Sequence, residues 1–201
     1  NISSPNTPNL RDFHETENLK KVIKAVKVGI FNSKIKNVEL PIFLKIAPDI
    51  DETNLETIIK VAYNQKITGL IISNTTIERI TGLKSKNINE VGGLSGKPLF
   101  SKSTNLLAVA NQMIKTNNYK LYLIAAGGVS DQYSAYTKIL CGADLIQLYS
   151  SMTYEGPMIA NKIIKGIQDL MKRDNIQSLD DIRGIASNVE IAVKIAKNGL
   201  K

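Results

Sequence analysis

Amide and hydroxyl side chains gather at the start of the chain, around two prolines. The first eight residues read Asn-Ile-Ser-Ser-Pro-Asn-Thr-Pro, so that Asn1, Ser4, Asn6 and Thr7 lie close together. Proline fixes its own φ and keeps the preceding residue extended, which predicts a shaped polar loop here rather than a helix or strand. Such loops, held by a rigid scaffold, often carry binding and catalytic groups. The alternative is a solvated turn whose Ser and Asn side chains cap the backbone.

A lysine interrupts the next apolar run. Lys45 lies within Phe-Leu-Lys-Ile-Ala, and Asp49 follows four residues later. Burying a lysine is costly unless its ammonium group meets an anion or a hydrogen-bonding partner. Two interpretations remain open: a salt bridge to Asp49 or another carboxylate, or a role toward a bound ligand.

Two further kinds of polar segment follow apolar runs. Ser73-Asn74-Thr75-Thr76 offers an amide and three hydroxyls, which could bind the edge of a polar heterocycle or simply form a turn. Glycine-rich and hydroxyl-bearing segments could offer backbone N–H groups to a phosphate, although glycines also serve in tight turns. These segments are Gly92-Gly93 with Gly96, Gly127-Gly128, and Tyr149-Ser150.

Apolar periodicity predicts alternating helices and strands. Strands are expected over residues 41–47, 67–73, 121–126 and 144–150, and amphipathic helices over about 19–30, 55–62, 107–114 and 159–170, with another after Asp131. The predicted N-caps are Asp51 or Thr53, Ser103 or Thr104, and Asp131, and Ser178 opens a capping-box-like start.

This alternation predicts an α/β fold with a parallel sheet covered on its faces. Every polar segment described above follows the carboxyl end of a strand, which is the edge where parallel α/β sheets and barrels bind ligands. The interval between the strand starts near residues 67 and 120 is about twice as long as the other two, and the excess lies between Thr76 and Ser103. Long loops in compact domains are usually functional.

Composition sets broad limits. The chain has 201 residues, enough for one domain, and 26 Lys+Arg against 18 Asp+Glu give a net charge of +8. The lysines are spread over helix faces without interleaved aromatics, which favours solvated surfaces over a nucleic-acid site. A single cysteine excludes an internal disulfide framework. No apolar run is long enough to span a bilayer.

Six segments in order resemble class 2, quinone-linked dihydroorotate dehydrogenase. They are Asn-Ile-Ser-Ser-Pro-Asn-Thr-Pro, Leu-Lys-Ile-Ala-Pro-Asp, Ser-Asn-Thr-Thr, Gly-Gly-Leu-Ser-Gly-Lys-Pro-Leu, Gly-Gly-Val and Gln-Leu-Tyr-Ser. The resemblance runs from Asn1 to about Lys172. Asn9, where the family usually has glycine, and Ala125-Ala126 are mild departures.

The resemblance implies a fold and an activity. The family is an FMN-containing (β/α)8 TIM barrel that oxidises dihydroorotate to orotate in pyrimidine (UMP) biosynthesis and passes electrons to a membrane quinone. Residues 1–201 would be the C-terminal portion of one barrel domain, from the loop after strand four through strand eight. The N-terminal half of the barrel and the membrane-associating helices would be absent, so the isolated chain is expected to be inactive. The implied location is peripheral, at the inner membrane, and on its cytoplasmic side if the source is a bacterium.

The resemblance also implies roles for individual residues. Ser4 would be the catalytic base that takes the proton from C5 of dihydroorotate while hydride leaves C6, with Thr7 and an ordered water as a proton relay. Ser3 and Ser95 are the rival hydroxyls. Substrate would be bound by Asn1, Asn6, Asn74 and Thr75. FMN would be bound by Asn1, Lys45, Ser73, Gly96, Gly128, Tyr149 and Ser150. No metal and no nucleic acid is expected.

Two alternatives belong to other classes. An RNA dihydrouridine synthase is also an FMN barrel and would explain the positive charge, but it predicts a cysteine acid in the site. Cys141 lies in Ile-Leu-Cys-Gly-Ala and is predicted to pack in the core, and His14 is predicted to be exposed. The other alternative is an inactive piece whose open sheet edges need a partner.

Overall fold

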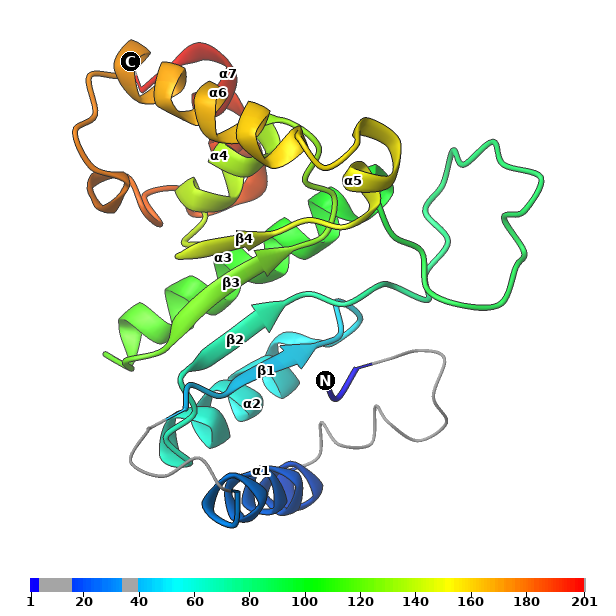
Figure 1. Cartoon of the computed structure of the whole chain (residues 1–201), viewed down its shortest axis with the longest axis vertical. Coiled ribbons are helices and arrows are strands. Elements are labelled where there is room, and N and C mark those ends of the chain that lie inside the picture. The colour runs from blue at the N-terminus through cyan, green and yellow to red at the C-terminus, as the bar shows by residue number, and fades with distance from the viewer. Residues whose placement is uncertain (4–15, 34–39, 201) are drawn as a thin grey trace.

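The structure is a computed structural model that describes residues 1–3, 16–33 and 40–200. Its centre is a parallel sheet of four strands in the order β1-β2-β3-β4 (Figure 1). The strands are β1 (Phe43–Ile46), β2 (Gly69–Ile72), β3 (Tyr122–Ala126) and β4 (Leu145–Gln147). All four predicted strands are therefore confirmed, each shorter than its apolar run.

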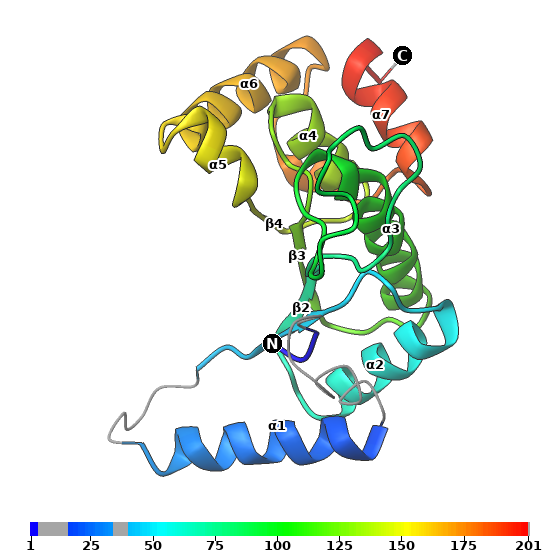
Figure 2. The ribbon, with the colours of Figure 1, turned by 90° about the vertical axis from the view of Figure 1, so that its right-hand side faces the viewer.

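Helices connect the successive strands. The helices are α1 (Thr16–Phe31), α2 (Glu52–Asn64), α3 (Phe100–Thr116), α4 (Gln132–Leu140), α5 (Ser150–Glu155), α6 (Ile159–Arg173) and α7 (Val189–Asn198), with short 3-10 helices η2 (Lys97–Leu99) and η3 (Leu179–Asp181). Helices α2 and α3 lie on one face of the sheet (Figure 2). Helix α4 packs against α6 and α7 at the β4 side of the molecule.

The main core lies between the sheet and these helices. Alternate strand residues point into it and meet the apolar stripes of α2 and α3, and all of them are buried: Leu44, Ile46, Leu70, Ile72, Leu55, Ile58, Ile59 and Leu107. Burying each such side chain contributes roughly 1.5–3 kcal/mol to folding. The core thereby fixes the positions of the strand ends that carry the polar segments.

The opposite face of the sheet differs from the prediction. Lys45, Ile71, Ile124 and Leu145 form one row across the four strands, and the Leu145 side of this row is open, since Leu145 is 62% exposed. The expectation that both faces are covered is wrong for the described residues. Sequential strand order joined by crossovers of one hand places the connecting helices on the same face, which is the arrangement of a barrel wall.

The helix starts test the predicted caps. Asp51 caps α2 by accepting a 2.7 Å hydrogen bond from the Asn54 N–H. Asp131 caps α4 in a reciprocal capping box with Ser134, and Ser178 does the same for η3. These three predictions are confirmed. Helices α5 and α7 were not predicted.

The predicted cap of α3 is wrong. This helix begins at Phe100, after η2, and no side chain caps it. Ser103 and Thr104 instead lie inside its first turns, fully buried. Thr104 donates a hydrogen bond to the Phe100 carbonyl, and the Ser103 hydroxyl lies 3.2 Å from the same carbonyl. The start is set by Gly96 and Pro98, because proline favours the first turn and the glycine adopts a φ of 75° that other residues avoid.

Within the described ranges, no helix combines the length and the apolar character that crossing a membrane requires.

Candidate functional site

A cavity of about 420 Å³ lies at the carboxyl ends of the strands. Its lining combines polar, glycine and apolar residues from β1, from the last residues of β3 and β4, and from the segments that follow β2, β3 and β4. These residues are Lys45, Ser73, Asn74, Thr75, Ser95, Gly96, Leu99, Ala126, Gly127, Gly128, Val129, Gln147, Leu148, Tyr149 and Ser150. Several of the polar segments singled out in the sequence therefore meet in one place, whereas Gly92 and Gly93 line a separate hollow in the loop after β2. A cavity of this size at this edge is typical of a small-molecule site.

The loop after β2 is tied to both neighbouring strands. The Ser73 N–H donates to the Ala126 carbonyl at 3.0 Å, and the Asn74 N–H donates to the Ile46 carbonyl at 2.9 Å. The peptide bond between Ile72 and Ser73 is cis. The Asn74 side chain accepts a 2.8 Å hydrogen bond from the Thr75 N–H. Asn74 and Thr75 are thus held at the cavity wall, as expected of ligand-binding groups.

The first residues of the chain cross the end of β1 and meet this loop. Ile2 N–H donates to the Lys45 carbonyl at 3.3 Å. The Oδ1 atom of Asn1 accepts from the Ser3 N–H, the Ser3 hydroxyl and the Asn74 amide. Asn1 is therefore tied to Asn74, which lines the cavity.

Ser3 is a poor candidate for the catalytic base. Its side chain is fully buried, and its hydroxyl lies 2.9 Å from both Asn1 Oδ1 and the Lys45 carbonyl while accepting from Asn74 at 3.2 Å. With these hydrogen bonds, the Ser3 hydroxyl holds the first residues of the chain against the end of β1. It has no access to the cavity, so the rival role considered for Ser3 is not supported.

Several residues named from the sequence lie outside the described residues. They are Ser4, Asn6, Thr7, Asn9 and His14. The roles suggested for them stay predictions.

Of the two interpretations left open for Lys45, a salt bridge to Asp49 is not what the structure has. Lys45 is half-buried at the cavity wall, and it forms no ion pair in the part of the chain that the structure describes. Asp49 pairs instead with Lys102 of α3 at 3.1 Å. Lys45 is thereby left to face the cavity.

Asp49 ties the loop after β1 to the loop after β2. Its carboxylate accepts hydrogen bonds from the Thr76 hydroxyl and from the Ile77 N–H, and Lys102 also pairs with Glu78. Burial would raise the pKa of Asp49, but the bonds from Thr76, Ile77 and Lys102 together hold that pKa below its usual value. The network fixes the chain immediately after Asn74 and Thr75.

Glycines form the other end of the cavity. Gly127 and Gly128 follow β3 with φ of 103° and 76°. A Cβ on Gly128 would lie 2.4 Å from Phe100 Cβ, so the turn packs directly on the start of α3. Gly96 and Ser150 also approach closely, and Ser95 Oγ lies 3.1 Å from Ser150 Oγ.

The long loop after β2 is organised by one arginine. Arg79 donates to the carbonyls of Ile77, Ile88, Glu90 and Gly92. The loop then pairs back on itself at Thr76 and Leu94 before it delivers Ser95 and Gly96 to the cavity. The sequence indicated that this loop is functional, but not that Arg79 holds it.

Sequence reasoning missed the apolar wall of the cavity. Leu99, Ala126, Val129 and Leu148 line it, opposite polar groups such as Asn74. Their positions next to the predicted polar segments are a signal that could have identified them. An apolar wall with a few polar groups is suited to a flat aromatic ring.

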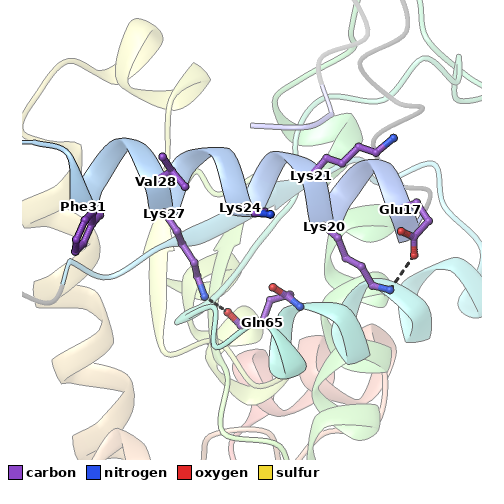
Figure 3. A pocket seen from close by; sticks show the side chains of 8 residues that line it. All are labelled: Glu17, Lys20, Lys21, Lys24, Lys27, Val28, Phe31 and Gln65. Carbon is purple, nitrogen blue, oxygen red and sulfur yellow. Dashed lines mark hydrogen bonds and ion pairs between the residues drawn. The ribbon is translucent and has the colours of Figure 1, made fainter.

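A second hollow, of about 570 Å³, lies along α1 (Figure 3). It is lined by Glu17, Lys20, Lys21, Lys24, Lys27, Val28, Phe31 and Gln65. The Lys20 ammonium pairs with Glu17 at 2.8 Å, and Lys27 donates to the Gln65 carbonyl. Most of these lysines are exposed, so the hollow is a solvated helix surface rather than a built site.

Comparison with known proteins bears on this arrangement. The family model described as dihydroorotate dehydrogenase matches residues 1–171. The chain belongs to the dihydroorotate dehydrogenase family. Curated relatives named dihydroorotate dehydrogenase (quinone) include one from Sinorhizobium medicae, 44% identical over 91% of this chain and 50% of the relative. Another, from Allorhizobium ampelinum, is 41% identical over 97% of this chain and 53% of the relative.

Solved structures of the family have a fold similar to that of this chain. The dihydroorotate dehydrogenase of Eimeria tenella in complex with ferulenol superposes with a TM-score of 0.82 at 31% identity, covering 92% of this chain and 52% of that one. The ligand-free form gives 0.83, again at 31% identity, over 92% and 54%. The expected fold class, the (β/α)8 barrel of this family, is confirmed. The chain spans about half the length of the curated relatives it matches.

The dihydrouridine synthase alternative finds no support in the site. Cys141, the single cysteine, is fully buried at the end of α4 with its sulfur 3.8 Å from the Asn188 carbonyl. Burial raises the pKa of its thiol to about 12, and Cys141 does not line the cavity. The prediction that Cys141 packs in the core is confirmed.

Proposed function

We propose that the full-length protein carrying this chain is a quinone-linked dihydroorotate dehydrogenase that oxidises dihydroorotate to orotate. The observation that carries the proposal is the convergence of Lys45, Asn74, Gly128 and Ser150 on one cavity in a member of this family. Lys45 lies in β1 itself, and the other three residues follow β2, β3 and β4. Residues 1–201 would form the C-terminal part of one barrel domain.

The cavity fits FMN by the chemistry of its lining. Leu99, Ala126 and Val129 suit a flat ring, and the glycine turns let backbone approach a phosphate. When bound, FMN would take two electrons from dihydroorotate and deliver them to a quinone. Gly96, Gly128, Tyr149 and Ser150 would hold its phosphate, while Ser73 and Asn1 would contact its ring region.

Lys45 would stabilise negative charge that develops on the flavin ring. Its ammonium group lies at the cavity wall without a carboxylate partner among the described residues, so its positive charge is available to negative charge that develops nearby. A fixed cation in a site that excludes water stabilises such charge more strongly than a solvated one.

Asn1, Asn6, Asn74 and Thr75 would hold the substrate, and Ser4 would remove its proton. The link between Asn74 and Asn1 orients two of these amides in advance. Amides held in this way reject a ligand that leaves them unpaired. A serine needs an exit for its own proton to act as a base, and Thr7 with an ordered water would provide that exit.

A peripheral association with a bacterial inner membrane, on its cytoplasmic side, is part of the proposal, because the electron acceptor is a membrane quinone. In this proposal, the segment that makes the contact would lie outside residues 1–201. No nucleic-acid partner and no metal is proposed.

Steady-state kinetics of the full-length protein test the proposal. We expect dihydroorotate-dependent reduction of a soluble quinone with formation of orotate. Ser4→Ala should reduce turnover by about 100-fold or more while the flavin stays bound, since a positioned base contributes roughly 10²–10⁴. The matched control is Ser101→Ala, an exposed serine on α3. Near-normal turnover of Ser4→Ala would refute Ser4 as the base.

A further inference from the structure

A buried lysine stands directly behind the glycine end of the cavity. Lys138 of α4 is fully buried, and no carboxylate pairs with it among the residues that the structure describes. A buried ammonium group without a counter-charge is one of the more costly features a fold can contain. An anion near Lys138 would offset this cost, and the described residues do not provide one.

The contacts of Lys138 point toward the cavity. Its Nζ donates to Ser103 Oγ at 3.0 Å and to Thr104 Oγ1 at 2.9 Å, and it lies 5.3 Å from the centre of the Phe100 ring. All three partners belong to the first turns of α3. Lysine has three donors, so two hydroxyls and one aromatic face account for its head group.

Hydrogen bonds of the two hydroxyls link Lys138 to the cavity wall. With Lys138 donating to them, their own protons turn to carbonyls: Ser103 Oγ to Gly127 at 3.1 Å, and Thr104 Oγ1 to Phe100 at 2.6 Å. Gly127 lines the cavity. One hydroxyl therefore separates the ammonium group from the wall, and the lysine holds the start of α3 against the glycine turn.

We propose that Lys138 is a positioning residue for a phosphate monoester, the phosphate group of FMN, bound at the Gly127–Gly128 turn. It fixes the turn through Ser103 and supplies positive charge behind it. The inference rests on the proposed function in taking FMN as the ligand. The amino end of α3 points to the same place, since Leu99 lines the cavity, and a helix amino end favours anions.

The ionisation of Lys138 agrees with this role. Burial lowers the pKa of Lys138 to about 7 and outweighs the opposing influence of Cys141. A nearby phosphate, which carries close to two negative charges, would favour the charged lysine and would in turn be held by it. The charge and the ligand would therefore stabilise each other.

The test compares FMN with riboflavin, which has the same ring and no phosphate. Full-length protein stripped of flavin is titrated with each, following flavin fluorescence. In Lys138→Met we expect the dissociation constant for FMN to rise about tenfold or more, and that for riboflavin to stay within about twofold. Lys138→Gln, which keeps a donor but not the charge, should behave in the same way. Lys162→Met, an exposed lysine on α6, is the control for net charge.

The other outcomes are also decisive. Equal weakening of both flavins would make Lys138 a structural residue and overturn the inference, as would unchanged FMN affinity. If neither variant folds, judged by thermal unfolding of the stripped protein, the fold itself needs Lys138 and the inference is wrong. A wild-type protein that binds neither flavin would instead refute the proposed function, so the two failures are distinguishable.

Discussion

The side-chain amide of Asn74 donates a hydrogen bond of 3.2 Å to Oδ1 of Asn1, which lies 73 positions earlier in the chain. The same amide lies 3.2 Å from Ser3 Oγ. The bonds join the loop after β2 to the segment that crosses the end of β1. Two predicted ligand-binding amides are thus oriented by each other, independently of any ligand.

Replacing Asn74 by aspartate should break this arrangement. Asn74→Asp removes both donated hydrogen bonds and sets a carboxylate against Asn1 Oδ1, which only accepts. We expect the dissociation constant for orotate, measured by its effect on the flavin spectrum of the full-length protein, to rise by about 10- to 100-fold. Asn64→Asp at the exposed end of α2 makes the same chemical change and should have no effect. Unchanged orotate binding in Asn74→Asp would exclude Asn74 from the substrate site.

The Asp49 network should stabilise the site. Asp49→Asn weakens the contacts with Thr76, Ile77 and Lys102, so we expect a loss of about 1–3 kcal/mol in the free energy of unfolding at neutral pH. Urea denaturation of the full-length protein measures it. Asp169→Asn is the control, because its contact with Lys172 is long, at 3.8 Å, and exposed. Equal stability of the two variants would contradict the network's role.

The lowered pKa of Asp49 predicts that the free energy of unfolding depends on pH. The pKa of Asp49 is lower in the folded protein than its usual value, so its contribution is fully present above the unfolded-state pKa of about 3.9 and is lost as pH falls toward the folded value. Between pH 5 and 3, stability should therefore fall less steeply in Asp49→Asn than in the wild type. Parallel curves of unfolding free energy against pH would show that Asp49 has an ordinary pKa.

Replacing Gly128 by alanine should abolish flavin binding. In Gly128→Ala a Cβ would lie 2.4 Å from Phe100 Cβ and 2.7 Å from its backbone nitrogen. Gly156→Ala is the matched control, because its φ of 77° is nearly that of Gly128, at 76°, while its Cβ would meet nothing within 4 Å. Both lose about 1–3 kcal/mol through backbone strain, but we expect flavin to be lost only from Gly128→Ala. Full flavin content in Gly128→Ala would place the phosphate elsewhere.

Arg79 should control the order of the long loop. Its guanidinium fork serves carbonyls of Ile77, Ile88, Glu90 and Gly92, a geometry that lysine cannot reproduce. Arg79→Lys should increase hydrogen exchange and proteolytic cleavage between residues 77 and 94. Lys84→Met, in the same loop, should not. A loop that stays protected in Arg79→Lys would show that other contacts hold it.

Local signals in the sequence predicted much of this molecule. The strands, the Asp51 and Asp131 caps and the polar segments after each strand depend on neighbours a few residues away, and the structure has them where they were expected. The failures are non-local. Asp49 pairs with Lys102 of α3, a residue far along the chain, rather than with the nearby Lys45.

Ser103 shows the same limit. A serine ahead of an apolar stripe reads as a helix cap, but here it is buried by Lys138, 35 residues later. The sequence does not indicate that Ser103 and Lys138 form a hydrogen bond. Lys138 directly precedes the apolar run Ile139-Leu140-Cys141, and in the structure it lies one hydroxyl behind the cavity wall.

The central claim is that this cavity brings flavin and dihydroorotate together. Mixing the purified full-length protein with dihydroorotate in the absence of oxygen and quinone tests it most directly. We predict that the flavin absorbance near its visible maximum is bleached and that one orotate forms for each flavin, after which added quinone restores the colour. A flavin-containing protein whose spectrum stays unchanged, with no orotate formed, would contradict the account.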